Sequence, residues 1–201
     1  MSRFHPNTDT LIDRWREKAA GRALPARVDI DPGDFLDVLP QTLIVGRTTR
    51  GLYPVRLTGA FVDDIHGEAI KGRNLLLLWD TEDRTRLQTA LELSRRHPHP
   101  VVAVAEARGT IGGITLIEML FAPLSGATAE VDRWLGLYQP LTPVARLLGQ
   151  PTLDLRLRAL QTADGAEGPT AHLRLAAVGG RRLEVLLPAR GRIEALKARR
   201  G

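Results

Sequence analysis

The stretch PHPVVAVAEARGTIGGITLIEMLFAPLSG, Pro98–Gly126, decides the fold class of this sequence. Two apolar, alternating runs flank a glycine-rich turn at residues 109–113, which is the pattern of two strands in a hairpin. We expect the strands over Val101–Arg108 and Gly113–Ala122. The turn leads into a strand and not into a helix, so it is not a phosphate-binding loop.

The segments around this hairpin complete a sheet. TLIVGRTTRGLYPVRLTGA predicts an earlier hairpin, with strands over Thr42–Arg47 and Tyr53–Thr58, and DRWLGLYQPL predicts a last strand. Between the hairpins lie short helical turns and a longer helix that begins at Thr81. Five strands in the order two, helices, three, without βαβ alternation, predict an α+β fold. Its antiparallel sheet carries helices on one face.

Both ends of the chain add to this unit. TLIDRWREKAAG predicts an N-terminal helix whose Leu11, Ile12 and Trp15 form an apolar stripe, which we interpret as a homodimer surface. LDLRLRAL, AHLRLAAV and RRLEVLLPA alternate as strands of a β-meander with one apolar face.

We therefore divide the chain into an N-terminal helical extension (1–40), a core (41–143) and a C-terminal β-meander with a basic tail (144–201). The apolar face of the meander needs a cover, which the core, a partner subunit or a membrane surface would supply.

Composition narrows the classes of function. The 201 residues are 43% hydrophobic and 25% charged, contain no cysteine, and lack the apolar run of a signal peptide or transmembrane helix. We expect a cytoplasmic protein. The net charge of +5 arises in residues 144–201, which hold 11 basic and 5 acidic residues. This segment has no aromatic residue for base stacking, which argues against a nucleic-acid-binding accessory, although that alternative stays open.

Catalytic and metal-binding motifs are weak. Asp63, Asp64 and His66 are the acid–base residue types, but no nucleophile accompanies them, and an acid capping a short helix is the simpler interpretation. The five histidines lack zinc-binding spacing. We predict no catalytic residue and no metal ligand.

Strand parity predicts an interior. If Glu106 and Glu118 face solvent, the small alanines of the first long strand face the long helix. They either leave a void for a small apolar molecule or let the helix pack closely. The residues predicted to line this interior are Leu57, Trp79, Leu87, Leu91, Ala103, Ala105, Ile117, Met119 and Phe121.

The chain also resembles a known family in residues spread over roughly 10 to 140. They are Trp15, Leu24-Pro25-Ala26-Arg27, Asp29, Asp31-Pro32, Leu39-Pro40, Tyr53, Arg56, Leu57, Gly59, Gly72-Arg73, Leu75 and Trp79. This pattern is similar to a bacterial PAS-like family of mostly single-domain proteins, and it departs from that family at Pro54 and Ala60. The resemblance implies a five-stranded PAS sheet and a regulatory sensor or adaptor that affects motility, growth or the cell surface through protein partners. It carries over no ligand-contact residues.

A non-catalytic PAS-like sensor or adaptor is thus the leading prediction, with a small-ligand enzyme or carrier using the same interior as the alternative. No cofactor is assigned. A cysteinyl-flavin adduct is excluded because the chain has no cysteine. Haem is disfavoured because His97 falls at the end of the long helix rather than within it.

Overall fold

The computed structural model describes residues 4–126, 129–147 and 151–163. The helices are α1 (Pro6–Ala19), α2 (Ala60–His66) and α3 (Thr81–Arg96), with short 3₁₀ helices η1 (Arg27–Asp29), η2 (Pro32–Gln41), η3 (Leu75–Leu78) and η4 (Val144–Arg146). The strands are β1 (Thr42–Gly46), β2 (Val55–Thr58), β3 (Val101–Gly109), β4 (Ile114–Ser125), β5 (Val131–Pro140) and β6 (Thr152–Thr162).

The strands form one antiparallel sheet in the order β2-β1-β5-β4-β3-β6. The predicted α+β class and the five strands of the core are confirmed. The predicted strand LDLRLRAL is present as β6 and extends the same sheet along β3, with Ala107 opposite Leu155. The other two predicted strands of the C-terminal meander lie outside the described residues.

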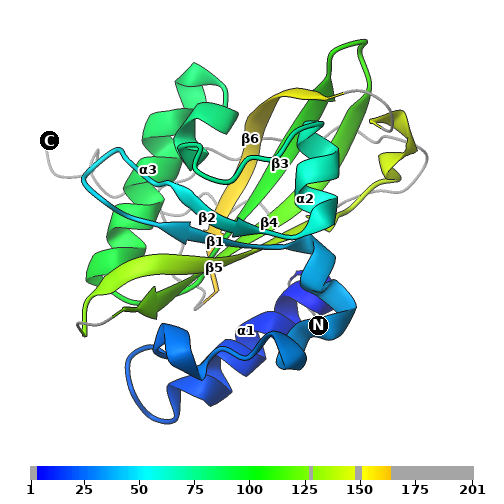
Figure 1. Cartoon of the computed structure of the whole chain (residues 1–201). Coiled ribbons are helices and arrows are strands. Elements are labelled where there is room, and N and C mark those ends of the chain that lie inside the picture. The colour runs from blue at the N-terminus through cyan, green and yellow to red at the C-terminus, as the bar shows by residue number, and fades with distance from the viewer. Residues whose placement is uncertain (1–3, 127–128, 148–150, 164–201) are drawn as a thin grey trace, which may run out of the picture. The chain divides into compact units, whose positions relative to one another are not determined.

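The central strands of the sheet are covered on both faces. Helices α2 and α3 lie on one side of it, and α1 lies on the other (Figure 1). One apolar cluster joins α2, η3 and α3 to the sheet, and we call it the inner core. A second cluster joins α1 and η2 to the opposite face, and we call it the outer core. Strand β4 contributes to both, which explains why its side chains are buried without alternation.

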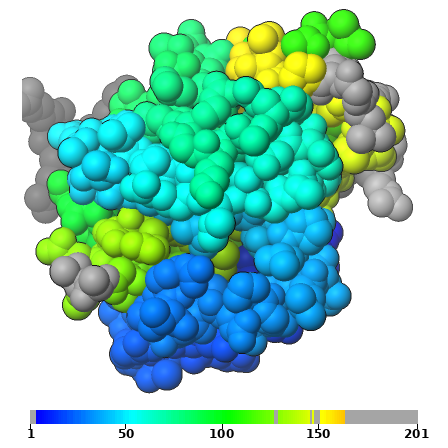
Figure 2. Space-filling model, in the orientation of Figure 1, coloured from blue at the N-terminus to red at the C-terminus, as the bar shows by residue number. Residues whose placement is uncertain are grey.

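The apolar stripe of α1 packs against the chain's own sheet, not against a partner. Leu11 and Ile12 are each 2% exposed, and the Trp15 indole Nε1 donates to the Pro123 carbonyl at 2.7 Å. Figure 2 shows the N-terminal segment in close contact with the elements above it. Because the stripe is already covered, the reasoning that predicted a dimer through it is wrong.

The start of α1 also corrects the prediction for Glu118. This side chain faces the α1 side, as expected from parity, but it is only 5% exposed. The His5 backbone N–H donates to Glu118 Oε1 at 2.9 Å, and Asn7 Nδ2 donates to Gln139 Oε1 at 2.9 Å. The N-terminal segment therefore covers a face that the strand pattern alone assigns to solvent.

Helix α3 has the termini that its sequence predicts. Asp80 caps it by accepting from the Glu82 N–H at 3.1 Å, and Glu82 and Asp83 lie in its first turn. Arg95 and Arg96 lie in its last turn, so both ends complement the helix dipole. In the described residues no helix is long and apolar enough to cross a membrane.

Candidate functional site

Eight of the nine residues predicted to line the interior lie together in the inner core. They are Trp79, Leu87, Leu91, Ala103, Ala105, Ile117, Met119 and Phe121, and each is essentially fully buried. The alanines come from β3, the two leucines from α3, and the remaining strand residues from β4. The structure thus brings these side chains to one place between the sheet and the helical layer.

Leu57 is the exception, and its prediction is wrong. Its side chain is 49% exposed. A bulge lies between Ile44 and Val45, so that Leu57 is opposite Ile44 while Val55 is opposite Val45. Ile44 belongs to the outer core and Val45 to the inner core. Leu57 therefore faces the side of the sheet opposite the predicted interior.

A polar pair lies within the apolar inner core. His66 Nε2, at the end of α2, and the Tyr138 hydroxyl of β5 are 3.2 Å apart, and the two rings meet edge to face. Burial lowers the pKa of His66 to about 4, an effect that the charge of Arg73 reinforces and that of Asp63 opposes. Burial also raises the pKa of Tyr138. Both groups are therefore neutral near pH 7.

The three residues weighed as an acid–base cluster point to different places. Asp63 braces the loops at either end of α2, since its carboxylate accepts from Thr58 Oγ1 at 2.9 Å and from the Ile70 N–H at 3.1 Å. Asp64 is exposed while His66 is buried. The N-cap of α2 is Gly59, so the expectation of an aspartate cap is wrong.

A second polar group ties α3 to the first hairpin. Tyr53 Oη donates to Glu92 Oε1 at 2.5 Å, and Arg47 Nε donates to the same oxygen at 2.7 Å. Burial opposes ionisation of Glu92, but hydrogen bonds from Tyr53, Arg47 and Arg95 outweigh it and lower its pKa to about 2. Burial, with a further contribution from Glu92, raises the pKa of Tyr53. This group is an ionised clamp between elements, and it was not foreseen from the sequence.

Trp79 is the one tryptophan whose indole N–H has no partner among the described residues. Trp15 donates to the Pro123 carbonyl, and Trp134 Nε1 donates to Ser94 Oγ at 3.3 Å. Trp79 is 1% exposed, and its Nε1 is buried without an acceptor. An unsatisfied buried donor of this kind costs about 1–3 kcal/mol. The Trp79 N–H is therefore a hydrogen-bond donor in the inner core that is available to an acceptor atom of a ligand.

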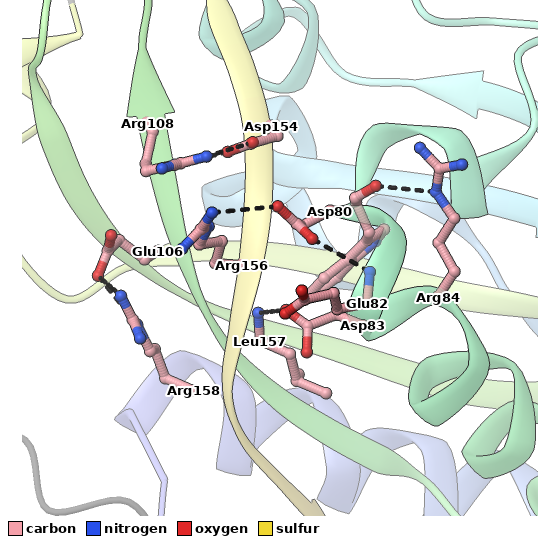
Figure 3. A network of polar contacts seen from close by, with 11 residues as sticks. Asp80, Glu82, Asp83, Arg84, Glu106, Arg108, Asp154, Arg156, Leu157 and Arg158 are labelled. Atoms are coloured by element: carbon pink, nitrogen blue, oxygen red, sulfur yellow. Dashed lines mark hydrogen bonds and ion pairs between the residues drawn. The ribbon is translucent and has the colours of Figure 1, made fainter.

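Strand β6 closes the inner core along β3. Leu155 and Leu157 are buried in it, and the Asp80 N–H donates to the Leu155 carbonyl at 2.9 Å. The Leu157 N–H donates to Asp83 Oδ2 at 2.8 Å (Figure 3). The edge of β6 is thus joined to the turn that leads into α3.

Comparison with known proteins identifies this architecture. A family model described as PAS domain matches residues 3–139, about two thirds of the chain. The chain belongs to the PAS domain family. A search of curated proteins finds no match.

Solved structures similar to this PAS domain share little sequence with it. The LOV protein of Rhodobacter sphaeroides is 14% identical with a TM-score of 0.43, over 58% of this chain and 71% of that chain. The PAS domain of a protein from Colwellia psychrerythraea is 15% identical with a TM-score of 0.41, over 50% of this chain and 86% of that chain. The family assignment therefore rests on the match to the family model over residues 3–139.

Two features of this chain go beyond the match to the family model. The matched residues end at β5, so β6 lies beyond the part that the PAS model covers. The chain also has no cysteine, which excludes a cysteinyl-flavin adduct. His97 ends α3 with an exposed side chain, as expected, and the described residues contain no group of three metal-ligating side chains.

Proposed function

We propose that this protein is a non-catalytic PAS sensor or adaptor. It binds a small, mostly apolar molecule in the inner core and passes its state to other proteins through its surface. PAS domains are a general sensor fold, which supports the broad class. The observation that supports ligand binding is the Trp79 indole N–H, which is buried in an apolar cluster without an acceptor.

The chemistry of the inner core defines the class of ligand. Apart from Trp79, its buried polar groups include His66 and Tyr138, and the His66 Nε2 and the Tyr138 hydroxyl contact each other. A molecule that fits would be largely apolar and would carry one uncharged hydrogen-bond acceptor, such as a carbonyl or a protonated carboxyl group. A charged acceptor is disfavoured because the surrounding side chains cannot replace its hydration.

The same residues support regulation rather than catalysis. Asp63 is committed to two hydrogen bonds and Asp64 is exposed, while the neutral imidazole of His66 contacts Tyr138. An enzyme or carrier using the same interior would need polar groups that converge on the ligand. Because the chain that follows β5 provides no aromatic residue for base stacking, we assign the regulated partners to proteins rather than nucleic acids.

Ligand extraction and thermal stability test this proposal. Protein purified from its own cells is denatured, and the released small molecules are identified by mass spectrometry. Those molecules and a panel of fatty acids and apolar carbonyl compounds are then tested for a rise in melting temperature. No released molecule and no thermal shift with any compound would contradict the ligand.

A tryptophan pair provides the matched control. Trp79→Phe removes the unpaired N–H and keeps an aromatic ring, so we expect it to shrink the ligand-induced shift. Trp134→Phe removes an N–H that already bonds Ser94 in the same cluster, so we expect it to lower stability while the shift remains. An equal ligand-induced rise in melting temperature in wild type and Trp79→Phe would show that the Trp79 N–H does not bind the ligand.

A further inference from the structure

The edge of β6 contacts α2, η3 and α3, and we call this line of contact the β6 seam. Thr152 Oγ1 donates to the Ile65 carbonyl of α2 at 2.7 Å. The Asp80 N–H, just after η3, donates to the Leu155 carbonyl, and the Leu157 N–H donates to Asp83 of α3. Four points therefore hold the helical layer to β6 in the described residues, when the ion pair of Arg156 with Asp80 at 3.3 Å is included.

The opposite edge of β6 is held far more firmly. The β3–β6 register runs from Val101 opposite Thr162 to Gly109 opposite Thr152. Two ion pairs reinforce it on the outer face, one between Arg108 and Asp154 and one between Arg158 and Glu106 (Figure 3). Breaking a backbone ladder of this length costs more than releasing a few separate contacts, so β6 and β3 should move as one unit.

The side chains behind the seam belong to the inner core. Trp79 forms an isolated parallel β-bridge with Leu155, and Ala105 lies opposite Leu157 in the sheet register. All of these side chains are buried. Separation of the Trp79–Asp83 segment from β6 would therefore open the inner core while the outer core stays packed.

We propose that the β6 seam opens as a local unit, with β6 remaining on β3, and so admits small molecules from solution to the inner core. Asp83 is the main hydrogen-bond contact of α3 with this edge, because its carboxylate accepts the Leu157 N–H. The opening is a property of this chain and needs no ligand. Its use in sensing rests on the proposed function.

The absence of cysteine makes a direct test available, since any introduced thiol is the only one in the chain. Ala105→Cys places a thiol in the inner core, and Ala122→Cys places one in the outer core. Both alanines are fully buried and the substitution is nearly conservative in size, so the two reporters are matched. The probe is a small aromatic disulfide reagent, and the measurement is its labelling rate under native conditions.

We expect the thiol of Ala105→Cys to react at least tenfold faster than that of Ala122→Cys. Adding Asp83→Ala should speed labelling at position 105 by about tenfold or more, the effect of losing a hydrogen bond to a charged group. The rate at position 122, corrected for the change in global stability, should stay the same. Asp83→Asn keeps an acceptor and should have a smaller effect than Asp83→Ala.

Asp154→Ala is the control on the other edge of β6, because it removes an ion pair to β3 without touching the helical layer. We expect it to leave the rate at position 105 within about twofold, as for an ordinary surface ion pair. Equal labelling at positions 105 and 122 would overturn the proposal, since only global unfolding would then expose either thiol. So would an equal acceleration by Asp154→Ala and Asp83→Ala, which would mean that β6 leaves β3. Neither result bears on the ligand search, which has its own readout.

Discussion

Mild acid should destabilise this protein through His66, before the carboxylates of its ion pairs are protonated. The imidazole is buried beside the Tyr138 hydroxyl, and burial lowers its pKa to about 4 from an ordinary value of 6.5. In the unfolded chain the same histidine is exposed and takes up a proton near its ordinary pKa. At a pH between these two pKa values, His66 is protonated in the unfolded state and neutral in the folded state.

The sign and size of the effect follow from linkage. Where the unfolded state binds more protons, the free energy of unfolding falls as the pH falls, so stability is lost as the pH drops from 6.5 toward 4. The full shift corresponds to about 3 kcal/mol at about 1.4 kcal/mol for each pKa unit. Between pH 7 and pH 5, about 2 kcal/mol of this should appear.

Urea denaturation followed by tryptophan fluorescence, repeated across this pH range, measures the effect. His66→Gln keeps an amide that can reach Tyr138 but cannot take up a proton, so its stability should change less between pH 7 and pH 5 by about 2 kcal/mol. Tyr138→Phe keeps the titrating ring and should retain the pH dependence of the wild type. Parallel curves for wild type and His66→Gln would refute the reasoning, because some other group would then account for any loss in acid.

Two further predictions concern the packing of the elements. Deletion of residues 1–20 uncovers the outer core around Leu120 and Leu137, so we expect self-association and a larger mass by light scattering; an unchanged mass and stability would contradict the packing of α1. Glu92→Gln removes the charge between Arg47 and Tyr53 and should lower the free energy of unfolding by about 1–3 kcal/mol at pH 7. That difference should shrink as the pH falls from 4.5 toward 2, because the unfolded wild-type chain protonates Glu92 in this range while the folded protein keeps it ionised; a constant difference would contradict the low pKa.

The order of elements and the inward face of the long strands could be predicted from the sequence because both are local patterns. Ala103, Ala105, Ile117 and Met119 lie on the inner side, as alternation requires. Helix α3 begins near Thr81, as its acidic first turn indicates. The order in which the strands lie side by side in the sheet was not predicted, because no local pattern contains it.

Leu57 and Glu118 show where local patterns fail. Alternation places Val55 and Leu57 on the same face, but the bulge at Ile44 and Val45 lets them face opposite sides. A bulge depends on how two strands pair, so one strand's sequence does not reveal it. Glu118 is a polar residue at an outward position, and it is buried only because the N-terminal segment returns across the sheet more than a hundred residues away in sequence.

The pair of His66 with Tyr138 was missed for a related reason. The two residues are 72 positions apart, and their contact depends on how α2 packs across β5. Strand parity does place Trp134 and Tyr138 on one face, so a buried tyrosine could have been expected, but nothing in the sequence supplies its partner. Long-range polar contacts of this kind are set by tertiary packing, which periodicity does not encode.

Strand β6 connects the predicted sequence pattern with the proposed behaviour of the protein. LDLRLRAL has one apolar face that needs a cover, and in the structure Leu155 and Leu157 are buried in the inner core. Asp154 and Arg158, on the charged face of the same strand, form ion pairs with β3. Both faces of the alternating pattern therefore attach β6 to the sheet. The contacts of β6 with the helical layer combine backbone groups with the side chains of Thr152 and Arg156 and the carboxylates of Asp80 and Asp83. A strand that is bound tightly at one edge and clasped at the other is suited to let the helical layer move while the sheet stays intact.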